Sequence, residues 1–163
     1  MHFRLEQSFA APVDAVALAF TEPELYEALG GLPKLGRPEV LSRTEDGEVV
    51  SLEVRYRFTG DLSAAARRVV DPAKLSWVER STHDLARHQV DFNLVPDNYG
   101  NMLRASGRYS FEPDGPNATR RVAEGDVAVK LPLVGKAVEN AIVSGIREHL
   151  TAEVPVVERY VAG

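Results

Sequence analysis

Apolar residues recur at helical spacing through the stretch from Pro132 to Val161, which predicts one long C-terminal helix. One face would carry Val134, Val138, Ala141, Ile142, Gly145, Ile146 and His149, and the other Lys136, Asn140, Arg147 and Thr151. With a rise of about 1.5 Å per residue, such a helix would be roughly 40 Å long and could cross a small domain. Pro155 lies inside the pattern, so we expect a kink or break near Ala152 to Val154.

The N-terminal part of the chain has a mixed pattern. His2 to Phe9 alternates as a half-buried strand does, with Phe3, Leu5, Gln7 and Phe9 on one side. Pro12 suits the first turn of a short helix, and Thr21 and Glu24 have the spacing of a capping box that would begin a second. A loop rich in glycine and proline follows from Gly30 to Pro38.

From Glu39 to Lys130 the pattern has a period of two, which is typical of strands. Asp46-Gly47 marks a hairpin turn. The expected strands are Val50 to Phe58, Ala64 to Val70, Leu75 to Thr82, His88 to Val95, Met102 to Phe111 and Arg121 to Leu131. The wide apolar face of the C-terminal helix needs a large partner, so we predict one curved antiparallel sheet opposite it.

Small residues suggest that the helix and the sheet do not meet tightly. Ala141 and Gly145 lie on the helix face, and the apolar faces of the last two strands carry Ala105, Gly107, Ala123 and Gly125. Small inward residues leave room above a sheet, and glycine also permits sheet bending. We therefore expect a cavity; the alternative is that the helix packs closer there and larger apolar side chains fill the space.

Composition and charge exclude several classes of protein. A chain of 163 residues, 44% of them hydrophobic, can form one domain with a core, which we place at residues 1–163. The formal charge of −5 and the lack of a long basic run argue against nucleic-acid binding. The absence of cysteine excludes disulfides and thiolate chemistry. No run is long enough for a stable membrane span, so we expect a cytoplasmic protein, either a monomer or a homodimer.

Three stretches, SFAAPVDAVALAFTEPELY, YRFTGDLSAAARRVVDPAKLSWVER and VKLPLVGKAVENAI, resemble the START-like or SRPBCC superfamily, which includes polyketide cyclases and Bet v allergen-like proteins. The last two look like an uncharacterised branch, a domain of unknown function. The resemblance implies an α+β helix-grip fold: a curved antiparallel sheet of about seven strands wrapped around a long C-terminal helix, with two short helices after the first strand. It also implies a deep, largely apolar cavity that opens near the short helices and loops.

The superfamily also includes oxygenases that bind iron through two histidines and a carboxylate. The four histidines of this chain, His2, His83, His88 and His149, do not have the spacing of that motif. We therefore expect no metal and no cofactor.

His149 and Glu79 are the candidate catalytic residues. His149 is central on the helix face and could orient a ligand or transfer a proton, or it could be a buried histidine bonded to a carbonyl or carboxylate. Glu79 shares a strand face with Trp77. If that face points inward, desolvation would raise the pKa of the carboxyl; if the other face does, Arg80 is the cavity charge.

Other polar residues have weaker claims. Tyr56 and Tyr109 lie on apolar strand faces and could anchor a ligand or belong to the core, and Gln7 has the same two interpretations. On the outer face of the sheet we expect a solvated ladder of Asp91, Glu124 and Asp126 with Arg104 and Arg108. The predicted ligand-binding set is Val54, Tyr56, Trp77, Phe92, Ala105, Gly107, Tyr109, Gly125, Val138, Ile142, Gly145 and His149.

These features favour a protein that binds or transports a small hydrophobic ligand, such as a lipid, isoprenoid, steroid or polyketide-like compound. The alternative is a cyclase, aromatase or dehydratase that uses His149 with Glu79 or a tyrosine in the same cavity. A third interpretation is an interaction module with a closed core.

Overall fold

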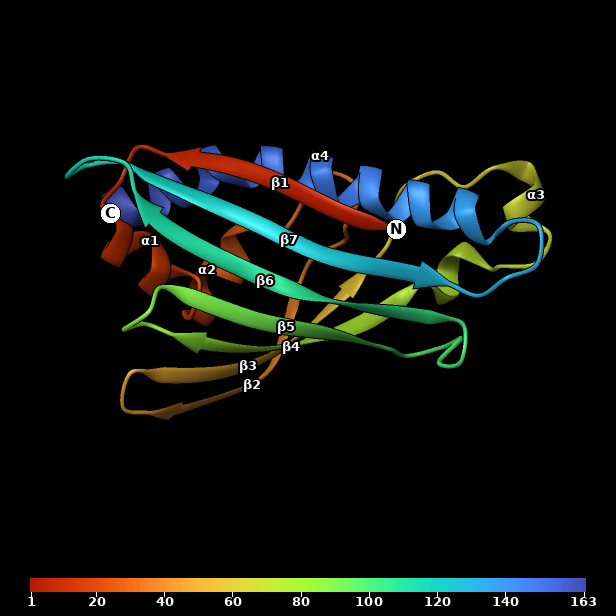
Figure 1. Cartoon of the computed structure of the whole chain (residues 1–163), viewed down its shortest axis with the longest axis horizontal. Coiled ribbons are helices and arrows are strands. Elements are labelled where there is room, and N and C mark those ends of the chain that lie inside the picture. Colours follow the sequence, from red (N-terminus) through yellow and green to blue (C-terminus); the bar gives the residue numbers. More distant parts are fainter.

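A computed structural model describes all residues, 1–163, and shows a seven-stranded antiparallel sheet that curves around one long helix (Figure 1). The strands are β1 (His2–Phe9), β2 (Glu39–Asp46), β3 (Val49–Arg57), β4 (Ser76–Asp84), β5 (Gln89–Pro96), β6 (Leu103–Pro113) and β7 (Thr119–Val129). Their order across the sheet is β1-β7-β6-β5-β4-β3-β2, so the first strand pairs with the last. The predicted α+β helix-grip fold is confirmed.

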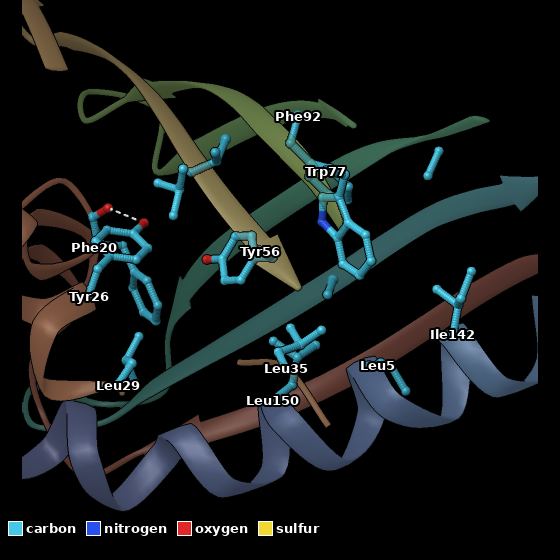
Figure 2. Packing of buried hydrophobic residues seen from close by; sticks show 14 of the residues in the cluster. Leu5, Phe20, Tyr26, Leu29, Leu35, Tyr56, Trp77, Phe92, Ile142 and Leu150 are labelled. Carbon is cyan, nitrogen blue, oxygen red and sulfur yellow. Dashed lines mark hydrogen bonds between the residues drawn. The ribbon is translucent and has the colours of Figure 1, made fainter. Parts of the chain in front are cut away.

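The helices are α1 (Val13–Ala19), α2 (Pro23–Ala28), α3 (Ala64–Arg67) and α4 (Gly135–Ala162), with a short 3-10 turn, η1, at Pro72–Lys74. In Figure 1, α4 runs along the sheet beside β1, and α1 and α2 lie near its C-terminal end. Apolar side chains from the concave face of the sheet and from α4 form a single core (Figure 2). The core lies between these two layers, so any internal site must lie there too.

The segment Ala64 to Val70, which we expected to be a strand, is helical over Ala64–Arg67. The Ser63 hydroxyl accepts a hydrogen bond from the backbone N–H of Ala66, and three successive alanines favour the helical turn. Ala66 is buried in this helix, and Val70, just beyond its end, is buried too and donates its backbone N–H to the Ala66 carbonyl at 2.9 Å. The strand prediction was therefore wrong because local capping and propensity outweigh a weak alternation.

Two other helix predictions were wrong in detail. Glu22, not Thr21, is the N-cap of α2, because Pro23 is the first helical residue; the Thr21 hydroxyl instead donates to the Leu18 carbonyl. Of the kink or break expected near Ala152 to Val154, the break does not occur, since α4 is continuous to Ala162. Pro155 lies on the exposed side of α4, where water can satisfy the carbonyl that loses its donor.

Candidate functional site

A small cavity lies between the sheet and the middle of α4. Its volume is about 50 Å³, and 14 of its 18 lining residues are hydrophobic. Since one water needs about 10–15 Å³ of such space, the cavity has room for a few waters, whereas ligand pockets usually measure about 300–1,000 Å³. The interior contains a void, as predicted, but its volume is much smaller than that of the deep cavity that the resemblance implied.

Half of the hydrophobic residues that line the cavity are aromatic: Phe3, Phe20, Tyr26, Tyr56, Trp77, Phe92 and Tyr109 (Figure 2 shows several of them). The rings of Phe92 and Tyr109 are stacked with centroids 4.7 Å apart, and those of Tyr56 and Trp77 are 6.5 Å apart. Such rings offer a rigid surface for another apolar molecule.

Half of the predicted ligand-binding set lines this cavity. Tyr56, Trp77, Phe92, Ala105, Tyr109 and His149 do so. Val54, Gly107, Gly125, Val138, Ile142 and Gly145 lie outside the lining, and all of these except the half-buried Gly107 are buried. The ligand-binding role of all twelve stays a prediction.

The glycines do not leave the room that we expected. Gly107 and Gly125 are directly opposite each other on β6 and β7. A Cβ on Gly107 would lie 2.8 Å from the Phe92 ring, and one on Gly125 would lie 3.2 Å from the Phe3 ring. The space beside Gly145 is filled in the same way by the Phe58 ring, which lies 2.9 Å from the position that a Cβ would take. At these three positions the small residues allow large neighbours to approach closely. The expectation that they leave empty space was therefore wrong.

Glu79 faces the cavity, which decides between the two faces that the sequence left open. On β4, Glu79 is paired with Val54 of β3, while Arg80 points outward and lies 3.5 Å from Glu53. The Glu79 carboxyl has no hydrogen bond or ion pair with any other residue, although Arg121 is close enough to affect it. Burial raises the pKa of Glu79 from its ordinary value of 4.5 to about 7, against the lowering influence of Arg121. Near neutral pH this carboxyl can therefore either donate or accept a proton.

A buried ionic cluster forms one wall of the cavity. Arg121 Nη1 donates to Glu153 Oε1 at 2.7 Å and to Gln7 Oε1 at 3.0 Å. Gln7 Nε2 donates to Glu153 Oε1 at 2.8 Å and to the Leu150 carbonyl at 2.6 Å. The Arg121 guanidinium also lies 3.9 Å from the centre of the Tyr109 ring. Gln7 thus points inward, as predicted, and its side chain holds the charged pair of Arg121 and Glu153 in place.

Arg121 and Glu153 were missed as site residues. Arg121 has the same position in the alternation of β7 as Ala123, and Glu153 follows His149 by four residues on α4, so each could have been assigned an inward direction. An isolated charge usually points to solvent, and only the pairing of these two makes their burial acceptable.

His149 both lines the cavity and contacts the ionic cluster. Its Nε2 lies 3.7 Å from Glu153 Oε2, its Nδ1 has no hydrogen-bond partner, and its ring meets Tyr56 edge to face. Burial lowers the pKa of His149, while Glu153 acts in the opposite direction. The imidazole is therefore neutral at physiological pH. It lies beside a carboxylate and reaches the cavity, and its role toward a ligand stays a prediction.

His83 continues the inward row of β4 beyond the cavity. Its Nε2 is 3.0 Å from the Ser81 hydroxyl, and burial lowers its pKa to about 4. No group of three or more histidine, aspartate or glutamate side chains is arranged to hold a metal ion. On the outer face, Arg108 pairs with Asp91 at 2.7 Å as predicted, but Glu124 and Asp126 pair with His2 instead.

Residues 4–161 match the model of a family described as "Protein of unknown function (DUF2505)". No curated protein matches the chain. No helix is long and apolar enough to cross a membrane.

Solved structures share the fold. TTHA0849 from Thermus thermophilus has a TM-score of 0.69 and 19% identity, covering 99% of this chain and 97% of its own. The Zhui aromatase/cyclase from Streptomyces sp. R1128 has a TM-score of 0.69 and 14% identity, with coverages of 99% and 93%. A START superfamily protein from Mycobacterium smegmatis has a TM-score of 0.60 and 20% identity, with coverages of 99% and 97%. At these identities the likeness concerns the fold alone.

Proposed function

This chain belongs to the DUF2505 family, whose function is unknown, so we propose a function from the cavity itself: the protein binds a small hydrophobic molecule between α4 and the sheet. The observation that carries this proposal is the aromatic wall around an unpaired carboxyl, Glu79. A fold selected for stability alone would fill such a space, because voids cost free energy and a carboxyl without a partner at the cavity wall is destabilised when it ionises. The ligand's apolar part contacts the rings, and a hydrogen-bond donor on it reaches Glu79.

The cavity must widen to admit a lipid, isoprenoid, steroid or polyketide-like ligand. Tyr26 on α2 lines both the cavity and a surface groove of about 700 Å³ between α2 and β2. Its hydroxyl is held by a hydrogen bond to the Phe20 carbonyl at 2.8 Å. In the proposal, rotation of Tyr26 breaks this one bond and joins the groove to the cavity, which gives the ligand an entrance.

Trp77, the only tryptophan in the chain, lies in the cavity wall and can report on binding. The test is native mass spectrometry of the purified protein for co-purified ligands, followed by titration with 2-naphthol while Trp77 fluorescence is recorded. We expect saturable quenching with one site per chain. Absence of both a bound molecule and saturable quenching would contradict the proposal.

Two alanines provide a matched pair of variants. Ala105→Val on β6 adds two carbons next to the cavity, whereas Ala123→Val on β7 adds them to packed core. Ala105→Val should weaken binding at least tenfold while the protein stays stable, because the space is available. Ala123→Val should lower stability, by about 1–3 kcal/mol, and leave the affinity of the folded protein unchanged.

The second candidate function is proton-transfer catalysis, favoured by the raised pKa of Glu79 and by the nearby hydroxyls of Tyr56 and Tyr109. Glu79 would be the general acid or base, as in the cyclase, aromatase or dehydratase alternative. His149 would position Glu153 and Tyr56 and would not itself transfer the proton.

Exchange of the acidic C–H protons of 2-tetralone in D2O, followed by mass spectrometry, tests this second candidate. We expect faster exchange with the wild type than with Glu79→Gln when the two proteins are compared at equal saturation with the ketone. Equal exchange rates at equal binding would leave only the binding function.

A further inference from the structure

Three connecting segments meet at the end of the molecule where α4 begins, and we refer to residues 64–74, 97–102 and 130–139 together as the tip. On the right of Figure 1, α3 and the connection from β7 to α4 lie beside each other. The backbone N–H of Asp71 donates to the Tyr99 hydroxyl at 3.0 Å, and Asn98 donates to the Lys74 carbonyl at 3.2 Å. The N–H of Lys130 donates to the Met102 carbonyl at 2.7 Å. These bonds make the three segments one continuous surface.

Each segment of the tip exposes a large apolar side chain. Val69 is 54% exposed, Met102 is 37% exposed and Leu133 is 105% exposed. Leu133 also has a φ of 69°, a left-handed conformation that costs an ordinary side chain free energy. The turn is fixed by hydrogen bonds from Val134 to Pro132 and from Gly135 to Leu131. Leu133 is therefore held outward, where it contributes nothing to the core.

The charges of the tip are opposite in sign to those of the whole chain. Five exposed basic residues of the tip form no ion pair: Arg67, Arg68, Lys74, Lys130 and Lys136. The three acidic residues of the tip are engaged: Asp71 caps η1, Asp97 pairs with Arg55, and Glu139 accepts from the Val129 N–H. The tip thus carries two more basic than acidic residues, although the chain has a formal charge of −5.

We propose that the tip docks reversibly on a lipid surface that contains anionic headgroups. Leu133, with Val69 and Met102, enters the boundary between headgroups and acyl chains, and the surrounding lysines and arginines contact the headgroups. The combination of exposed apolar side chains with free cations is what such an interface accommodates. A nucleic acid would use the cations but leave Leu133 exposed, so the lipid surface accounts for both features.

This inference does not depend on the internal cavity, because none of the tip residues lines it. A protein that exchanges apolar ligands with a membrane would benefit from both features, but each can fail without the other. The tests are accordingly separate.

Cosedimentation with vesicles tests the proposal. The full chain is mixed with vesicles of phosphatidylcholine alone, or with 30% phosphatidylglycerol, in 20 mM and in 500 mM NaCl. We expect association only with the anionic vesicles and at low salt, since surface attraction is screened within a Debye length.

Two tip variants should weaken this association. Leu133→Asn should reduce the partition coefficient about tenfold. Asparagine tolerates a left-handed backbone, so the variant should fold normally. The double variant Lys130→Gln with Lys136→Gln should reduce the coefficient about 25-fold, at about fivefold for each charge. Leu18→Gln is the matched control, because Leu18 is 46% exposed on α1, outside the tip, and its replacement should have no effect.

Three results would overturn the proposal: equal association with neutral and anionic vesicles, no association with either, or association that both tip variants leave unchanged. Sedimentation velocity tests whether a second copy of this chain binds the tip. A dimer that Leu133→Asn converts to a monomer would assign the tip to a second copy of this chain instead.

Discussion

Replacing Glu79 by glutamine should make the protein more stable at alkaline pH and change its stability little in acid. In the unfolded chain the carboxyl has its ordinary pKa of 4.5, whereas in the cavity burial raises the pKa to about 7. Below pH 4.5 both states hold the proton. Between these two pKa values the folded state keeps a proton that the unfolded state has lost, so wild-type stability falls as pH rises.

The size of the effect follows from the two pKa values. Their difference corresponds to about 3 kcal/mol, which would be fully lost above about pH 8 and which Glu79→Gln would restore. His83 acts in the opposite direction: its pKa is lowered to about 4, so its contribution to stability grows as pH rises toward 6.5. The lowered pKa of His149 acts in the same direction as that of His83. The informative quantity is therefore the difference between wild type and variant, in which both histidines cancel.

Urea unfolding followed by far-ultraviolet circular dichroism, at intervals from pH 4.5 to 8.5, measures this difference. Circular dichroism is preferable to fluorescence because Trp77 is two residues from the substitution. Glu53→Gln is the control, since Glu53 is a partly exposed carboxylate on the outer face of the neighbouring strand. A difference between wild type and Glu79→Gln that stays constant across this range would refute the assignment of Glu79 to a desolvated cavity.

Three other substitutions test the packing around the site. Glu153→Met should lower the free energy of unfolding by about 3–5 kcal/mol, because it leaves the Arg121 charge buried without a partner. Adding Arg121→Met should recover much of that loss in urea unfolding. A double variant as unstable as the sum of the two single variants would contradict the pairing. Gly107→Ala should lower the unfolding temperature and cost about 1–3 kcal/mol, because its Cβ would lie 2.3 Å from the Glu124 carbonyl; calorimetry showing no change would count against this packing. Ser63→Ala should cost about 1 kcal/mol and speed hydrogen exchange at the amide that Ser63 caps, and unchanged exchange would disprove the cap.

Periodicity predicted much of the architecture because both layers bury one continuous face. The alternation of β1 and the 3.6-residue spacing of α4 each reflect contact with the same core, so the pattern was enough to assign both elements and their inward faces. Periodicity gave the wrong prediction for the segment after Ser63, because four helical residues are too few to show a period.

The site was only partly predictable, because it depends on register and on pairs of distant residues. Strand β4 has apolar and charged residues on both faces, and only its pairing with β3 sets Glu79 inward. Arg121 and Glu153 are acceptable in the interior through each other, although 32 positions separate them. The size of the cavity depends on rings such as Phe92 that fill the space above glycines, which no property of the glycines themselves indicates.

The pairing of β1 with β7 has a consequence for biosynthesis. Phe9 pairs with Thr119, 110 positions later, and β1 has no other strand neighbour. At about 5–20 residues per second, a ribosome needs roughly 5 to 20 s to deliver that partner. During this interval the apolar face of β1 has no strand to pair with, so we expect a chaperone that binds emerging polypeptides to engage β1 until β7 has been synthesised.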